Sequence, residues 1–341
     1  MQSKKRNRLL QWVSVVAITT LATVALASCE RIYDDLDPCP HGVSLRFVYD
    51  YNMEYANAFP AQVDCLTLYI YDEEGNYVDT KVVTGAELQD EDYRMRLDLE
   101  EGTYHFVAYG GLACGESSFS VLQTPAQGSK KTDLRVAMDA DCLTVPARRK
   151  LHDLFWGELT LTTVDLYREG TVKMMKNTNT LRIVLQQEDE TQSVNVDDFD
   201  FEITDDNTLF NHDNDLLPNG EITYIPWAKG QAQTGVAIVG PGQVEPQPVE
   251  VAYAEFSTSR LMTKNSPRLV VKRRKDGETV IDFPLNEYLL IMKSDRYEMG
   301  NQEYLDRESR WALFFFLRNG IWLQTRIVVN DWVVRINNVE A

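Results

Sequence analysis

The chain has few of the residues and motifs that most enzyme active sites need. Its 341 residues include only four histidines, and none of them lies in an H-E-x-x-H pattern. The G-x-S-x-G turn of hydrolases, the P-loop and the G-x-G-x-x-G fingerprint are also absent from the sequence. No pair of carboxylates stands out, so a glycosidase has no support. We therefore predict a protein that is not an enzyme and that uses no cofactor.

Positive charge is scarce as well. The chain has 34 Lys and Arg against 52 Asp and Glu, which gives a net charge of −18 at neutral pH. Such a surface repels the phosphate backbone, and the sequence has no basic stripe that would offset the repulsion. We therefore exclude nucleic acid as a partner.

The N-terminus has the pattern of a bacterial lipoprotein signal. A basic start and an apolar run lead to a lipobox formed by Leu26, Ala27, Ser28 and Cys29. This order of segments is typical of a secretory signal that is cleaved after small residues. We expect cleavage before Cys29 and acylation of its thiol, including palmitate, because several acyl chains hold a protein durably on a bilayer. The predicted location is the outer membrane, with the protein lipid-anchored at the cell surface. The alternatives are an ordinary signal peptide or an N-terminal transmembrane helix.

The cysteines that follow Cys29 form no C-x-x-C pair, and their spacings are long and irregular. Both features disfavour a zinc site. An even number of cysteines in an exported protein favours one or two disulfides, and three full pairings are open. The candidates are Cys39, Cys65, Cys114 and Cys142.

The remainder of the chain alternates between apolar and polar residues, as β-strands do. Val43, Leu45 and Phe47 alternate with their neighbours, and Asn319-Gly320 between two apolar runs is a strong hairpin signal. Strands recur about every dozen residues with turn signals between them, which is typical of a β-sandwich. One short helix is expected after Asn286, where Leu285, Leu289 and Met292 have helical spacing.

The length of the chain suggests about two folded domains after the signal. We predict a signal peptide over residues 1–28 and an acidic tether over 29–39. A first β-sandwich is expected over 40–167 and a second over 168–341.

An acidic segment at 205–215 has the oxygen ligands that calcium prefers. An EF-hand loop that begins at Asn211 needs glycine and glutamate where the chain has Leu216 and Ile222. Asn and Asp also fill turns because they hydrogen-bond to the local backbone. We favour a structured turn over a calcium loop and predict no metal site.

A series of sequence blocks runs in order along nearly the whole chain after Cys29. The blocks are CPHGVSLRFVYDYN, LTLYIYDEEGNYV, GTYHFVAYGGL, LFWGEL, NTNTLRIVL, FEITDDNTLFNHDNDLL, ITYIPW, EYLDRESRWALFFFL and IVVNDWVVRINNVE. Together they make the chain resemble the FimB/Mfa-type fimbrial anchor lipoproteins of the Bacteroidales.

The resemblance implies an all-β fold of two tandem transthyretin-like, Greek-key β-sandwich domains. It also implies a structural role in cell adhesion. Such an anchor fixes the shaft of a fimbria, or pilus, to the outer membrane, and fimbrial shaft subunits are its partners. In this family an arginine-specific protease removes the first strand of shaft subunits, and a neighbour's C-terminal strand fills the groove. Here no basic residue lies between Arg31 and Arg46, and Arg46 falls within a strand, which favours an anchor.

We predict that the last strand contacts the first shaft subunit, because a chain-terminal strand can swing out without breaking connections on both sides. The residues concerned are Trp332, Val333, Val334, Arg335 and Ile336. An equal alternative is that this strand only completes its own sheet.

Two other functions stay open at the level of sequence. A surface lipoprotein of the same layout would bind glycans if aromatic residues such as Tyr49, Tyr51 and Tyr55 were exposed together. A secreted hydrolase would need a pocket in which histidine and carboxylates converge.

Overall fold

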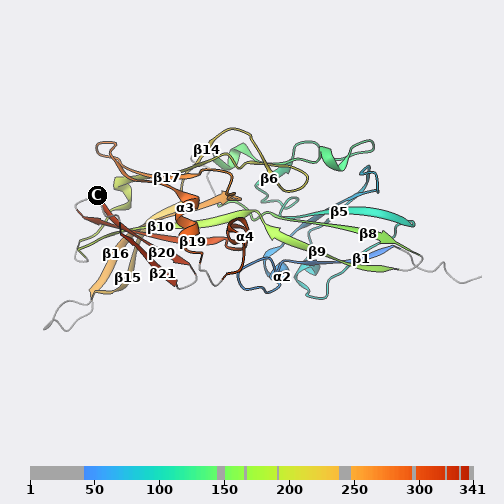
Figure 1. The fold of residues 1–341 in the computed structure, drawn as a ribbon, viewed down its shortest axis with the longest axis horizontal. Helices are drawn as coiled ribbons and strands as arrows, with labels where there is room; N and C mark the ends of the chain where they lie inside the picture. The colour runs from blue at the N-terminus through green and yellow to red at the C-terminus, as the bar shows by residue number, and fades with distance from the viewer. Residues whose placement is uncertain are drawn as a thin grey trace, which may run out of the picture.

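The computed structural model is an elongated, all-β molecule, with the first half of the chain at one end of the long axis and the second half at the other (Figure 1). It describes residues 42–143, 150–164, 167–189, 192–237, 247–293, 297–318, 321–329 and 332–337. Within these residues, no helix is long and apolar enough to cross a lipid bilayer. Each half is a β-sandwich, as predicted.

A seven-stranded sheet in the order β3-β2-β5-β8-β9-β1-β4 forms the first half. Its strands are β1 (Val43–Val48), β2 (Leu66–Tyr71), β3 (Tyr77–Val83), β4 (Met95–Leu97), β5 (Gly102–Gly110), β8 (Phe155–Thr163) and β9 (Arg168–Lys176). The sheet curls, so that Leu45 of β1, Leu68 of β2 and Phe106 of β5 share one core. Val43 and Phe47 lie in the same core, which confirms the alternation read from the sequence.

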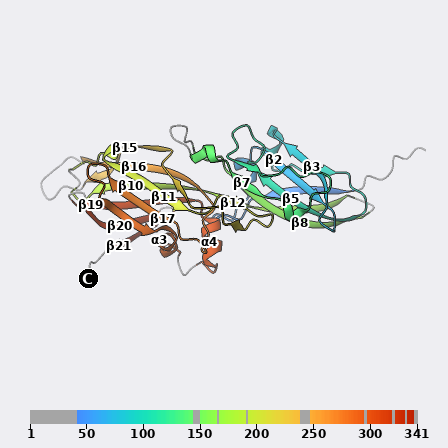
Figure 2. The ribbon, with the colours of Figure 1, turned by 90° about the horizontal axis from the view of Figure 1, so that it is seen from above.

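A small four-stranded sheet in the order β13-β12-β7-β6 joins the two halves of the chain. Its strands are β6 (Phe119–Val121), β7 (Val136–Met138), β12 (Leu209–Phe210) and β13 (Leu216–Leu217). Leu209 pairs with Ala137 and Phe210 with Val136, and Figure 2 shows β12 beside β7 near the middle of the long axis. Main-chain hydrogen bonds therefore connect the first half directly to the second.

Two further sheets form the second half, in the orders β15-β16-β10-β19-β20-β21 and β14-β11-β17-β18. The first contains β10 (Thr178–Gln187), β15 (Ala228–Ala237), β16 (Gln247–Ser259), β19 (Arg310–Arg318), β20 (Ile321–Val329) and β21 (Trp332–Asn337). The second contains β11 (Phe199–Asp205), β14 (Ile222–Tyr224), β17 (Arg268–Arg273) and β18 (Thr279–Pro284). Phe256 and Phe315 of the larger sheet lie in one core with Phe201 and Phe283 of the smaller.

The connections between the strands contain short helices and helical turns. The predicted helix is present as α3 (Leu285–Ile291), and the sequence pattern did not indicate α4 (Asn301–Arg307). The remaining helical turns are α2 (Phe59–Gln62), η1 (Ala86–Gln89), η2 (Lys131–Asp133), η3 (Ala140–Leu143) and η4 (Val196–Asp198). At seven residues, α4 is too short to show a clear helical period.

The predicted division between the domains, at residues 167 and 168, falls directly before β9. β9 begins at Arg168 and pairs with β8 and β1 of the first sheet. The chain crosses into the second half at Asn177, between β9 and β10. The strand pattern of β9 could not reveal this, because alternation identifies a strand and not the sheet that the strand joins.

Candidate functional site

A group of buried polar side chains lies where the chain passes from the first half to the second. Such groups are costly to bury unless they are hydrogen-bonded, so their concentration at one place needs an explanation. The group includes Lys176, Asn177, Thr178, Asn179, Asn214, Ser257, Ser259 and Asp306. We call Asn177, Asn214, Arg260 and Asp306 the junction network.

Asn177 is the residue at which the chain crosses between the halves, and it is fully buried. Its Nδ2 donates to Oδ1 of Asn214 at 2.6 Å, and Nδ2 of Asn214 donates back to its Oδ1 at 3.1 Å. Its main-chain N donates to O of Leu154 in the first half at 2.7 Å. Asn214 has a φ of 65°, a conformation that asparagine tolerates better than most residues. The crossing point is therefore hydrogen-bonded to both halves.

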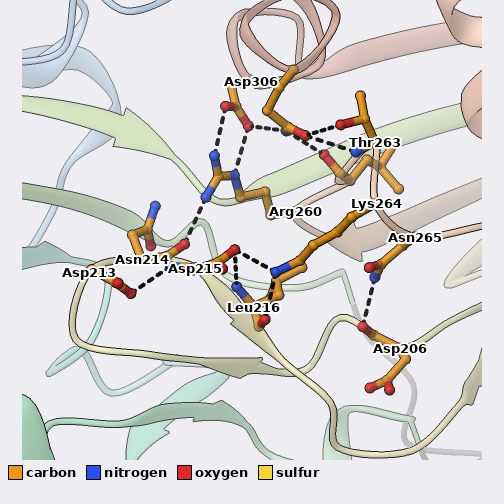
Figure 3. A network of polar contacts seen from close by, with 12 residues as sticks. Asp206, Asp213, Asn214, Asp215, Leu216, Arg260, Thr263, Lys264, Asn265 and Asp306 are labelled. Carbon is orange, nitrogen blue, oxygen red and sulfur yellow. Dashed lines mark hydrogen bonds and ion pairs between the residues drawn. The ribbon is translucent and has the colours of Figure 1, made fainter.

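Arg260 and Asp306 form a buried, two-pronged ion pair next to this crossing (Figure 3). Nε and Nη2 of Arg260 donate to the two carboxylate oxygens of Asp306, both at 2.7 Å. The two side chains are 11% and 5% exposed, so water hardly screens the pair. Arg260 also donates through Nη1 to O of Asn214 at 2.7 Å. The pair thus links the end of β16, helix α4 and the turn before β13.

Helix α4 also contacts the first half through Arg307. Its guanidinium lies 4.0 Å from the ring centre of Tyr51 and 4.7 Å from that of Tyr55. Nη1 of Arg307 donates to O of Asn52 at 3.4 Å. A cation over an aromatic face stabilises a contact by about 0.5–2 kcal/mol, depending on desolvation. Arg307 therefore connects the loop after β1, in the first half, to helix α4 in the second half.

The same contact accounts for tyrosines that the sequence left open for sugar stacking. Tyr49 is buried, and its ring meets Phe155 edge-on at 5.1 Å. The rings of Tyr51 and Tyr55 each form a cation–π contact with the guanidinium of Arg307. Tyr49 is therefore part of the core, whereas the half-buried Tyr51 and the 58% exposed Tyr55 are both occupied by Arg307.

A second, partly buried ion pair lies on the first-half side of the crossing. Nζ of Lys176 is 2.7 Å from Oδ2 of Asp153, and Oγ1 of Thr178 donates to Oδ1 of Asp153 at 2.8 Å. Burial alone would raise the pKa of Asp153, but the charge of Lys176 and these hydrogen bonds lower it below its ordinary value. Asp153 is therefore ionised at neutral pH and connects the segment before β8 to the crossing.

The structure joins two of the predicted cysteines, Cys65 and Cys114, in a disulfide with their Cα atoms 5.7 Å apart. The bond connects the start of β2 to the loop after β5. Cys142 is buried, with its Sγ 3.8 Å from O of Ser118. The predicted lipobox, Cys29 and Cys39 lie outside the described residues.

The predicted contact strand is β21, at the edge of the six-stranded sheet. It is antiparallel to β20, from Val329 opposite Trp332 to Gln324 opposite Asn337. In this state the strand completes its own sheet, while its other edge ends the strand order. An edge of this kind presents main-chain groups for pairing.

The acidic segment at 205–215 is hydrogen-bonded to donors of the chain itself. Asp206 accepts from the main-chain N of Asn219 at 2.8 Å, and Asp215 accepts from Nζ of Lys264 at 2.6 Å. Figure 3 shows Lys264 reaching both Asp215 and the main chain of Leu216. These contacts are those of a structured turn, the favoured interpretation of the sequence.

Asp205 differs from its acidic neighbours because it points into the protein. It continues the inward alternation of β11 after Phe201 and Ile203. Its Oδ1 accepts from Nδ2 of Asn265 at 3.0 Å, whereas its buried Oδ2 has no hydrogen-bond partner. Burial raises the pKa of Asp205 from 3.8 to about 6.

The sequence gives no indication that Arg260 pairs with Asp306 at the end of the second half, or that Arg307 contacts the first half. Arg260 and Asp306 are 46 positions apart, and no short motif connects them. The asparagine-rich turn that contains Asn214 is typical of a structured turn or a calcium loop, and its pattern does not indicate a contact with Asn177. The residues around Asp306 are mostly charged, and a charged run of this kind usually indicates a segment exposed to solvent.

Comparison with known proteins identifies similar chains. A sequence model of the family described as fimbrillin-A associated anchor proteins Mfa1 and Mfa2 matches residues 36–338. A structure described as a candidate adhesin from Bacteroides thetaiotaomicron VPI-5482 is 61% identical, with a TM-score of 0.83 over 89% of this chain and 100% of its own.

Two other solved structures are similar over comparable lengths. One, described as a candidate polysaccharide-binding protein of Bacteroides thetaiotaomicron VPI-5482, is 30% identical, with a TM-score of 0.73 over 88% of this chain and 99% of its own. The fimbrial anchor protein Mfa2 from Porphyromonas gingivalis has the same fold at 15% identity, with a TM-score of 0.61 over 87% of this chain and 100% of its own. No curated protein matches the sequence.

Replacing Asp306 with Ala should destabilise the protein by about 3–5 kcal/mol, because it leaves the buried charge of Arg260 without its carboxylate. Urea unfolding at pH 7 measures the change. The matched control is Asp282→Ala, which removes the carboxylate of the Arg268 pair, whose side chains are 49% and 44% exposed. That change should cost at most about 1 kcal/mol. Equal losses in the two variants would contradict the importance assigned to the buried pair.

Replacing Asp205 with Asn should change how stability depends on pH. Below about pH 4 the carboxyl is protonated in both states, and above about pH 6 the folded protein carries a buried charge. The stability of the natural protein should therefore fall as pH rises through this window, by up to about 3 kcal/mol. In Asp205→Asn this fall should be missing. Urea unfolding at pH 4, 5, 6 and 7 tests it, and parallel pH profiles for the two proteins would refute it.

Proposed function

The chain belongs to the family of fimbrillin-A associated anchor proteins Mfa1 and Mfa2, and from that membership we propose that it is the lipid-tethered anchor of a fimbria. In this role it fixes the fimbrial shaft to the outer membrane and acts as a structural protein, not as an enzyme. The observation that carries the proposal is the family match, which extends over residues 36–338 and therefore over both sandwiches. The lipobox that ends at Cys29 supplies the membrane attachment.

The placement of β1 supports an anchor over a shaft subunit that is trimmed by a protease. β1 lies inside the sheet, with Leu45 opposite both Met95 of β4 and Gly170 of β9. Arg46, the first basic residue after Arg31, is part of this strand. A protease needs an extended, accessible segment, and β1 is hydrogen-bonded on both sides. The first strand would therefore stay in place.

The positions of the first and last described strands along the molecule support the same function. β1, which follows the tether, lies in the half opposite to β21 along the long axis (Figure 1). Tension between a membrane and a shaft bound at β21 would therefore pass through the junction between the sandwiches. The paired strands β7 and β12, the crossing at Asn177 and the ion pair of Arg260 with Asp306 lie on this path. A hydrogen-bonded junction of this kind suits a protein that is pulled from both ends.

The proposed shaft contact is the free edge of β21, residues Trp332 to Ile336. A partner strand added to this edge would gain main-chain hydrogen bonds, while alternate side chains would set its register.

Glycan binding has less support as the function of this chain. One relative is described as a candidate polysaccharide-binding protein. In this chain, however, the tyrosines that might stack on sugars are engaged with Phe155 and Arg307. We therefore keep the fimbrial anchor as the single proposed function.

Cys29→Ala in the native host should release fimbriae from the cells without preventing their formation, because the anchor loses its lipid. Filaments in the medium and on the cell pellet are compared by immunoblotting. Ser28→Ala is the matched control, since it keeps a small residue before an intact Cys29, and it should leave the filaments cell-bound. Filaments that stay on Cys29→Ala cells would show that this protein does not tether them.

Deleting residues 331–341 should abolish shaft capture while leaving the protein in the outer membrane, because β21 is removed and Cys29 is kept. Deletion of 338–341 is the control, because it ends the chain just after β21. Co-purification of shaft subunits with the membrane fraction is the measurement, and thermal unfolding shows whether the shortened protein is folded. Normal retention of shafts by a folded 331–341 deletion would assign the contact to another surface.

A further inference from the structure

Three different metal-ligating side chains meet at one place on the first sandwich. Asp64 directly precedes the disulfide cysteine Cys65, Cys114 lies in the loop after β5, and His152 lies on the segment before β8. One ligand atom from each of Asp64, Cys114 and His152 lies within 4.8 Å of the other two. In the part of the chain that the structure describes, no other three His, Cys, Asp or Glu residues meet this condition.

The main chain fixes the position of these side chains through Gly111. This residue has a φ of +85°, and a Cβ on it would stand 1.9 Å from O of Asp153. Only glycine allows the segment 152–153 to approach so closely. The main-chain N of Gly111 also donates to O of Cys65 at 3.0 Å. The segments that carry Asp64 and His152 are therefore both pressed against the end of β5.

The present contacts already resemble those of a metal site. Nε2 of His152 lies 2.9 Å from Oδ2 of Asp64, and Sγ of Cys114 lies 3.2 Å from Oδ1 of Asp64. Around a tetrahedral Zn²⁺, donor atoms of these kinds stand about 3.3–3.6 Å apart. The other ring nitrogen of His152, Nδ1, is buried and has no hydrogen-bond partner. Small shifts of side chains would therefore bring three ligands to one ion.

The disulfide decides whether the third ligand is available. Cys114 is bonded to Cys65, and a disulfide sulfur lacks the charge of the thiolate that binds zinc. Two molecules of a small thiol can reduce this bond. They give up two electrons and two protons, become a disulfide themselves, and leave Cys65 and Cys114 as thiols. Zn²⁺ binding then releases the proton of the Cys114 thiol.

Solvent and ions have a path to this place. An open cavity of about 330 Å³ borders His152 and is also lined by Gln62, Glu116, Lys150 and Asp153. Cys114 is half-buried, whereas Cys65 is 1% exposed, so an incoming thiol meets the sulfur of Cys114 first. The cavity brings water to the His152 side of the three ligands, and zinc sites with three protein ligands keep a fourth position for water.

We propose that Asp64, Cys114 and His152 form a redox-controlled Zn²⁺ site that is closed by the Cys65–Cys114 disulfide and opened by thiol reduction. The oxidised protein offers zinc only a carboxylate and an imidazole, which are hydrogen-bonded to each other. The reduced protein adds a thiolate, the strongest zinc ligand of the three. The site lies on the first sandwich, away from the proposed β21 contact, and is independent of the anchor function.

Cys65→Ala tests the proposal, because it leaves Cys114 as a thiol without any added reductant. Zn²⁺ affinity of the purified full chain is measured by competition with a chromogenic chelator, after thiol titration has confirmed that Cys114 is free. We expect Cys65→Ala to bind one Zn²⁺ at least about 100-fold more tightly than the oxidised natural protein. Co²⁺ in place of Zn²⁺ should show a sulfur-to-metal charge-transfer band.

Matched variants separate this site from other thiols. Cys114→Ser or His152→Gln, each added to Cys65→Ala, should weaken Zn²⁺ binding at least about 10-fold. Cys142→Ala in the same background should not change it. If circular dichroism shows that Cys65→Ala is unfolded, the natural protein reduced with a phosphine replaces it.

Three results would overturn the proposal. The first is equal Zn²⁺ affinity of oxidised and reduced protein, which would exclude the thiolate as a ligand. The second is the absence of Zn²⁺ binding by folded protein with a free Cys114. The third is binding that is unchanged by His152→Gln, which would leave His152 and Asp64 as an ordinary hydrogen-bonded pair at the surface.

Discussion

The ion pair between Arg260 and Asp306 orders the end of the second sandwich that faces the first, and the contacts between the two sandwiches are built on that end. Both charges are almost fully removed from water, and their mutual attraction offsets that cost only when the remaining donors and acceptors are satisfied. Here O of Asn214 accepts a hydrogen bond from the guanidinium of Arg260. Nδ2 of Asn214 donates to Oδ1 of the crossing residue Asn177. The pair therefore needs both the turn before β13 and helix α4 in their places.

Helix α4 connects the ion pair to the first sandwich. Asp306 faces Arg260, and the next residue, Arg307, lies against Tyr51 and Tyr55. A displacement of α4 would expose one buried charge and separate one cation from two rings. Both contacts therefore oppose a displacement of one sandwich relative to the other. The strands β7 and β12 add main-chain hydrogen bonds to the same junction.

This construction suits the proposed anchor. A tether that is pulled away from a membrane experiences force along its length, and two sandwiches joined by a plain linker would separate at the linker first. The buried polar junction replaces such a linker by contacts that involve three different parts of the chain. The first sandwich also contains a disulfide beside Asp64 and His152, and the second ends in a strand with a free edge. The chemistry and the proposed partner contact thus lie on different sandwiches.

The amino-acid sequence by itself determined the strands, the sandwich class, helix α3 and the pattern of a lipoprotein signal. These features depend on neighbours two to four residues apart, and burial of one face imposes that spacing directly. Only the tertiary structure decided that β9 joins the first sheet, that Cys65 pairs with Cys114, and that Arg260 meets Asp306. Those contacts join residues tens of positions apart, and long-range pairing leaves no periodic trace in a single sequence. For the same reason, the sequence does not indicate that His152 lies beside Asp64. The two residues are 88 positions apart and meet because Gly111 allows their segments to approach closely.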